Sequence, residues 1–188
     1  AVDGISTVVN SYGDDVITAT QAADIMFSAV KDGKTTFEEL SGSLATVLPI
    51  ASSLGVSFAE VAASVALMTS MGMKTTTATS GLRGMFVEAT KTGTELDKAI
   101  REIAGDSMGE LIASGDTAAS VLQQVRTSMP DQEFRDLFGS VEASGAALMV
   151  TGANYEKFDT MLGHGLESAG ALDGAFATVA ETAQFKLD

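Results

Sequence analysis

The chain has 188 residues, which is enough for one hydrophobic core of ordinary size and short for two independent domains. Acidic residues outnumber basic ones by 25 to 11, which gives a formal net charge of −14, and the stretch from Thr35 to Met73 contains neither lysine nor arginine. This composition argues against specific nucleic-acid binding, because contacts to phosphates need clustered lysine and arginine. Cysteine is absent, so disulfide frameworks, thiolate zinc sites and thiol catalysis are excluded.

The apolar side chains are mostly small or flexible. Hydrophobic residues make up 45% of the chain but aromatic residues only 6%, and nine residues are methionine. Such side chains suit helix-on-helix packing, and the 19 glycines are spread along the chain as helix ends would be. The sequence predicts an all-α fold, a compact multi-helix bundle of short helices and αα-hairpins with Gly-rich turns. The chain starts at Ala1 without an initiator methionine or a signal segment, so we expect a fragment of a longer protein.

Four helix starts share one capping pattern, in which a hydroxyl side chain is followed three residues later by an acid or amide. The four pairs are Thr18 with Gln21, Thr36 with Glu39, Ser57 with Glu60, and Thr94 with Asp97. Apolar residues at helical spacing predict one helix from Thr36 to Gly55 and a second from Ser57 to Gly72. The two would form an αα-hairpin around Leu54 to Val56.

The rest of the chain is also predicted to be helical, although Thr75 to Thr79 is interpreted as a loop that leads into a helix. The sequence predicts a single domain of residues 1–188. The stretch from Gly105 to Asp116, which contains several Gly, Ser and Asp residues, is a possible subdomain break within it. The remaining predicted helices are Val2 to Ser11, Ala19 to Lys31, Thr77 to Thr92, Thr94 to Ile103, Thr117 to Ser128, Pro130 to Phe138, Val141 to Val150, Asn154 to Leu166, and Ala171 to Leu187.

Residues capable of catalysis or metal binding do not form a recognisable site. His164 lies between two glycines and is interpreted as an exposed turn residue without a second metal ligand nearby. The carboxylate pairs Asp14–Asp15 and Glu38–Glu39 are adjacent in sequence, so their side chains point apart and cannot share a proton. The sequence therefore predicts no catalytic, cofactor-binding or metal-ligating residue, no cofactor and no enzymatic activity.

Two further segments allow alternative interpretations. Ser80 to Gly84 lacks the Gly-Lys-Ser ending of a phosphate-binding loop, and Gly81 and Gly84 are expected to permit close helix packing instead. Between Leu40 and Met73 the only charged residue is Glu60. This stretch is interpreted as a helix pair buried in a bundle or against another subunit, with membrane insertion as the alternative.

Several short motifs follow one another in a recognisable order. They are Gly55-Val56-Ser57-Phe58, Leu67 to Met73, Thr77 to Arg83, Leu137-Phe138-Gly139-Ser140, Glu142-Ala143, and Ser168-Ala169-Gly170-Ala171. In this order, over nearly the whole chain, the sequence resembles the core region of phage tail tape measure proteins. The Leu82-Arg83 pair of the family is kept, whereas the small residues from Ala78 to Gly81 are permuted relative to the family pattern.

The resemblance implies a structural phage tail protein that takes part in tail length determination, tail assembly and genome ejection. It implies a place in the virion, in the tail tube interior, after assembly in the bacterial host cytoplasm. The implied partners are other copies of the chain, tail tube and tail tip proteins, and tail assembly chaperones. The alternative function is a membrane-active helical segment that inserts into the host membrane during genome delivery, with transient membrane contact.

The spacing of glycines and caps refines this expectation. A helix stop is predicted roughly every ten to twenty residues, so the region should fold back on itself and not form a rod. We therefore expect a module for assembly, tail-end docking or ejection, with length measured by less interrupted parts of the parent chain.

Overall fold

The computed structural model describes residues 2–172 and 174–175, and within these residues every regular element is a helix, as the sequence predicted. The longest, α6, has 16 residues, equivalent to about 24 Å of helix. Most of the predicted helix Ala171 to Leu187 lies outside the described residues. In chain order the elements are α1 (Val2–Tyr12), α2 (Ala19–Asp32), α3 (Phe37–Leu44), α4 (Leu48–Leu54), α5 (Phe58–Ser70), α6 (Thr75–Thr90), α7 (Glu95–Ala104), α8 (Met108–Ala113), α9 (Ala118–Thr127), α10 (Asp131–Asp136), α11 (Val141–Met149), the 3-10 turn η1 (Gly152–Asn154) and α12 (Tyr155–Leu166).

Helix α5 forms the centre of the core. Every residue from Phe58 to Thr69 is buried, and α2, α4, α6 and α12 all pack against this helix. A helix that is apolar all round needs neighbours on every side, which explains the nearly uncharged sequence of this stretch. The interpretation of the Leu40 to Met73 region as helices buried in a bundle therefore holds for α5.

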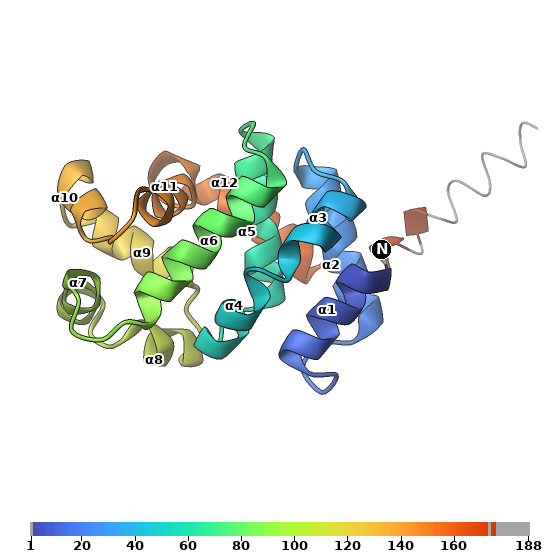
Figure 1. Ribbon diagram of the computed structural model, residues 1–188, viewed down its shortest axis with the longest axis horizontal. Coiled ribbons are helices and arrows are strands. Elements are labelled where there is room, and N and C mark those ends of the chain that lie inside the picture. The colour runs from blue at the N-terminus through green and yellow to red at the C-terminus, as the bar shows by residue number, and fades with distance from the viewer. Residues whose placement is uncertain (1, 173, 176–188) are drawn as a thin grey trace, which may run out of the picture.

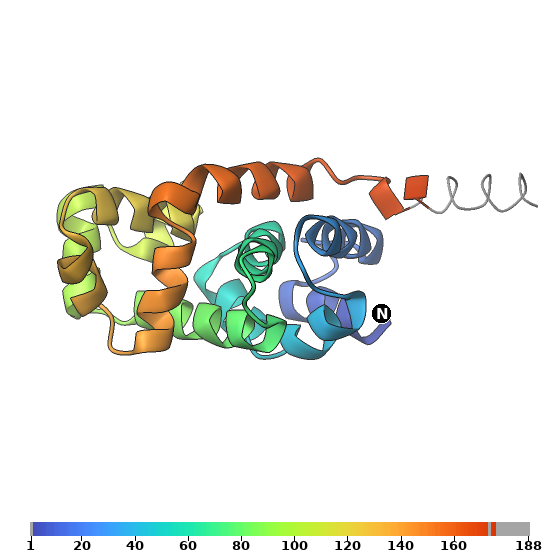
Figure 2. The same ribbon diagram turned by 90° about the horizontal axis from the view of Figure 1, so that it is seen from above.

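The helices are arranged along one long axis. Helices α1, α2 and α3 gather at one end and α7 to α10 at the other, with α5 and α6 between them (Figure 1). Helix α11 packs against α6, while α12 returns from the α7–α10 end and lies against α5 and α2 (Figure 2). The later part of the chain thus spans the molecule and connects its two ends.

The predicted caps are present at all four helix starts, but only two of them are complete capping boxes. In the Thr18–Gln21 and Thr36–Glu39 pairs, the hydroxyl and the partner side chain each bond to the backbone of the other residue. At α7 the Thr94 hydroxyl accepts the Asp97 N–H, while the Asp97 carboxylate accepts the N–H of Gly93 at 2.7 Å. At α5 the glutamate of the pair has a different partner, described below.

The single helix predicted from Thr36 to Gly55 is wrong, because the chain breaks between α3 and α4. Pro49 has no N–H and its ring would clash with the preceding turn, so it occupies the second position of a new helix. The break also lets Leu44, Val47 and Leu48, which are all fully buried, face the core together. The predicted αα-hairpin is formed by α4 and α5, where Gly55 ends α4 with a left-handed φ of 86°.

The prediction of a loop at Thr75 to Thr79 is also wrong, because α6 begins at Thr75. The Thr75 hydroxyl lies 2.7 Å from that of Thr35, and the Thr79 hydroxyl donates to the carbonyl of Thr75 at 3.2 Å. These bonds satisfy hydroxyl groups that are buried in the first turns of the helix. Tertiary contacts therefore outweigh the β propensity of the threonine run.

The prediction that Gly81 and Gly84 permit close packing is confirmed. A Cβ at Gly81 would lie 3.3 Å from the Ala146 side chain, and one at Gly84 would lie 3.5 Å from that of Ala143. Helices α6 and α11 thus approach each other through small residues on both sides.

Candidate functional site

His164 lies in the last turn of α12, so its interpretation as a turn residue is wrong, although it is exposed as expected. Its Nδ1 atom is 2.7 Å from Oδ2 of Asp32, the last residue of α2. The helix continues through the two flanking glycines, and buried Gly165 packs against Ala59 of α5. In the part of the chain that the structure describes, no group of three or more histidine and acidic side chains is placed to hold a metal ion.

The other candidates from the sequence are dispersed. Asp14 and Asp15 are exposed in the loop between α1 and α2, and Glu39 is engaged in its capping box. The Ser80 to Gly84 segment lies in the middle of α6, where the backbone amides are used within the helix. Among the described helices, none has both the length and the apolar character needed to cross a membrane.

Glu60 is a buried carboxylate on the central helix, with 2% of its surface exposed. Its Oε1 atom accepts the N–H of Ala119 at 3.1 Å, and the N–H of Ala118 also bonds to the carboxylate. Glu60 therefore caps the start of α9, far along the chain, and does not complete the capping box with Ser57. Burial raises the pKa of Glu60 to about 7, while the amides of Ala119 and Ala118 act in the opposite direction by stabilising the ionised form.

Asp24 makes a second long-range connection of this kind. It is 3% exposed on α2, and its two carboxylate oxygens accept the N–H groups of Gly170 and Leu172 at 2.9 and 3.0 Å. The carboxylate thereby fixes the segment that follows α12 to α2. An aspartate inside the apolar run Ala22 to Met26 was the sequence signal for such a buried polar contact.

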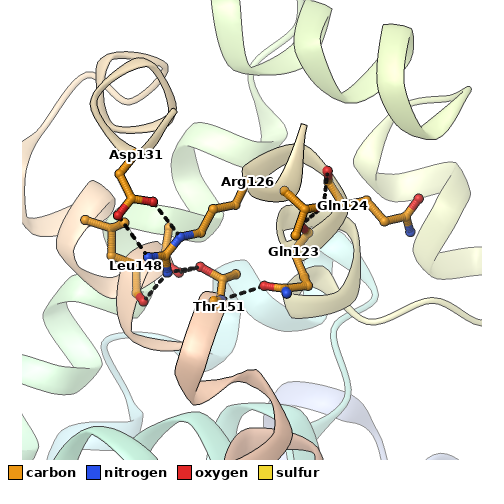
Figure 3. A network of polar contacts seen from close by, with 9 residues as sticks. Gln123, Gln124, Arg126, Asp131, Leu148 and Thr151 are labelled. Atoms are coloured by element: carbon orange, nitrogen blue, oxygen red, sulfur yellow. Dashed lines mark hydrogen bonds and ion pairs between the residues drawn. The ribbon is translucent and has the colours of Figure 1, made fainter. Parts of the chain in front are cut away.

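Arg126 organises a third polar network at the α9–α11 end (Figure 3). Its guanidinium group donates to both carboxylate oxygens of Asp131, at 3.1 and 3.3 Å. It also donates to the carbonyl of Leu148 and the hydroxyl of Thr151, at 2.9 and 3.0 Å. The N–H of Gly152 is held in turn by the amide oxygen of Gln123 at 2.6 Å. The network connects α9, α10, the end of α11 and the η1 turn.

Glu60, Asp24 and Arg126 share one property. Each directs its polar atoms to backbone or side-chain groups of another element of this chain, and sequence reasoning missed all three partners. Such contacts fix helices relative to one another. Holding the helices in place is therefore the role of these three side chains.

One surface pocket of about 250 Å³ lies where the end of α1, the α1–α2 loop, the start of α5 and the end of α12 meet. Its apolar lining includes Ile17, Ile25 and Phe58. Val16 and Leu166 also line the pocket, and they are 70% and 66% exposed. We call this feature the Val16–Leu166 pocket.

A family model of phage-related minor tail proteins matches residues 1–141. A probable tape measure protein of Clostridium phage phiCD119 is 32% identical over 195 aligned positions, which cover 100% of this chain and 21% of that protein. A tape measure protein of Pneumococcus phage Dp-1 is 28% identical over 193 positions, which cover 98% of this chain and 16% of that protein. No solved structure matches. The resemblance predicted from the motif order is confirmed, and the chain belongs to the phage-related minor tail proteins.

Proposed function

We propose that this chain is a compact, non-enzymatic module of a tape measure protein. The parent protein as a whole is proposed to act in tail length determination, tail assembly and genome ejection. The names of the relatives support the tape measure role, and the chain spans only about a fifth or less of their length. The proposed location is the tail tube interior of the virion, after assembly in the host cytoplasm. The proposed partners are other copies of the chain, tube and tip proteins, and tail assembly chaperones.

The short helices are the observation that supports a second part of the proposal, namely that this module is not itself the measuring rod. A single helix of 188 residues would span about 280 Å at ~1.5 Å per residue. The described residues instead fold back repeatedly, and the longest helix has 16 residues. We infer that the module contributes little to tail length and that length is set by other parts of the parent protein.

The negative charge is compatible with a position in a channel that DNA later crosses. A chain with a net charge of −14 repels the phosphate backbone and does not hold the DNA. Solubility is a simpler explanation of the same charge.

The test is an in-frame deletion and a tandem duplication of the codons for residues 2–175 in the parent phage gene. Electron microscopy then measures the length of the tails. A rod of these residues would change tail length by about 260 Å, and we expect a change far smaller than that in either variant. A change near the rod value, in the direction of the alteration, would contradict the proposal. An equally long alteration at another place in the same gene serves as the control.

A further inference from the structure

The Val16–Leu166 pocket has an apolar opening because its polar side chains are already engaged. The Tyr12 hydroxyl donates to the carbonyl of Val56 at 2.8 Å, and the Ser57 hydroxyl accepts the N–H of Glu60 at 3.2 Å. Gln21 is used in the α2 capping box, and Asp24 accepts two backbone amides. What the pocket offers to another molecule is therefore mainly apolar surface.

Exposed apolar side chains concentrate at this pocket. Among the described residues, four large hydrophobic side chains are exposed, and two of them, Val16 and Leu166, lie at the pocket. Single exposed hydrophobic residues are ordinary, but two that flank an apolar hollow form a continuous patch. At about 250 Å³ the hollow is smaller than a site for a drug-sized molecule and matches one or two inserted side chains.

The charges around the pocket indicate the kind of partner. Asp14 and Asp15 directly precede Val16, Glu167 directly follows Leu166, and all three are exposed. None of the residues that line the pocket is lysine or arginine. A second copy of the chain would bring its own net charge of −14 to this acidic rim, so charge complementarity favours a basic partner.

We propose that the Val16–Leu166 pocket docks an amphipathic helix of a partner protein, whose apolar anchors are flanked by lysine or arginine. The anchors enter the hollow between α2, α5 and α12, and the basic residues face Asp14, Asp15 and Glu167. This is helix-in-groove recognition, in which apolar side chains at helical spacing supply the contact area. This inference rests on the proposed function, because the docked helix would belong to an assembly partner. The binding test uses the isolated chain, so the docking proposal can fail while the tail-length experiment succeeds.

The test measures binding of a fluorescent peptide made of leucine and lysine, with leucine at positions i, i+3, i+4 and i+7. We expect saturable binding, with shifts of the methyl NMR signals of Ile17, Ile25 and Leu166. The same peptide with glutamate in place of lysine should not bind. Equal binding of the two peptides would overturn the charge argument.

Because a chain this acidic attracts many cations, surface variants must separate the pocket from general attraction. Leu166→Ser and Val16→Ser should each weaken binding by about tenfold or more, since each removes exposed apolar contact area. Val141→Ser is the matched control, because Val141 is 84% exposed at the start of α11, outside the pocket. All three positions are exposed, so the variants should fold as the wild type does. An equal loss of binding in the control would overturn the proposal.

Two other molecules could occupy the pocket, namely a second copy of the chain or another segment of the same chain, and each is tested separately. Sedimentation of the wild type and of Leu166→Ser tests for a second copy, and a dimer lost in the variant would overturn the proposal. A chain truncated after residue 175 tests for occupation by the chain itself. We expect the truncated and complete chains to bind the peptide equally, and binding by the truncated chain alone would also overturn the proposal.

Discussion

Glu39 and Glu60 occupy the same position in two related helix starts, yet their carboxylates have different partners. Glu39 is exposed and returns to the backbone of Thr36 at 3.0 Å. Glu60 is buried and bonds to the start of α9. The local pattern predicted both hydroxyl caps correctly, but it could not reveal that α9 lies beside the second one. The partner of a buried polar residue depends on long-range packing, and the same holds for Asp24 and Arg126.

The first prediction concerns the pH dependence of stability through Glu60. Its pKa is about 7 in the folded chain, against an ordinary value of 4.5. The folded state thus holds this proton more tightly than the unfolded state does. The resulting stabilisation is complete below about pH 4.5 and is lost as the pH rises through about 7. It amounts to about 3 kcal/mol of unfolding free energy.

Urea unfolding of the wild type and of Glu60→Gln at pH 5 and pH 8 tests this prediction. Glutamine does not titrate, but its carbonyl still accepts the N–H of Ala119. Other carboxylates contribute equally to both proteins, so the difference between the two pH profiles isolates Glu60. We expect the wild type to lose stability relative to the variant as the pH rises. Parallel profiles would show that Glu60 has no raised pKa.

At the scale of helices, the sequence predicted most starts and ends but not the places where packing interrupts a pattern. The apolar spacing around Leu44 and Leu48 continues across the α3–α4 break, and only Pro49 signals the interruption. The threonines at 75–79 have low helix propensity and yet begin α6, because their hydroxyls bond across to Thr35 and back to the helix. The spacing of apolar residues predicts which face of a helix is buried. Where one helix ends and the next begins depends on the surface against which the segment packs.

The second prediction concerns Gly33, where the end of α2 passes close to α5. A Cβ at this position would lie 2.6 Å from Oγ1 of Thr69 and 2.9 Å from the Cα of Ala66. Backbone cannot move away as a flexible side chain can, so Gly33→Ala should lower the unfolding free energy by about 1–3 kcal/mol.

The matched control for Gly33 is Gly145→Ala in the interior of α11, where a Cβ meets nothing within 4 Å. There the methyl group restricts the unfolded chain and favours the helix, so stability should rise by about 0.5–1 kcal/mol. Urea unfolding of the two variants measures both effects. Equal changes in the two variants would mean that the α2–α5 approach is not tight.

For the whole molecule, the long-range contacts favour one folded unit, which we propose for residues 1–188. Glu60 on α5 caps α9, and α12 returns to α5 and α2. The Gly105 to Asp116 stretch contains α8, which contacts α4 and α6 as well as its neighbours in sequence. A subdomain break there would have to separate these contacts, so we propose that the stretch is a connection within one domain.

The third prediction is the size of the isolated chain in solution. A compact domain of 188 residues has a radius of gyration of about 16 Å, whereas a rod of about 280 Å has one near 80 Å. Because Asp24, Glu60 and Arg126 each fix helices that lie far apart in a rod, we expect small-angle X-ray scattering to give a value close to the compact one. The distance distribution should also end far below 280 Å. A rod-like profile would contradict the compact fold, and it would remove the argument that tail length is measured elsewhere in the parent protein.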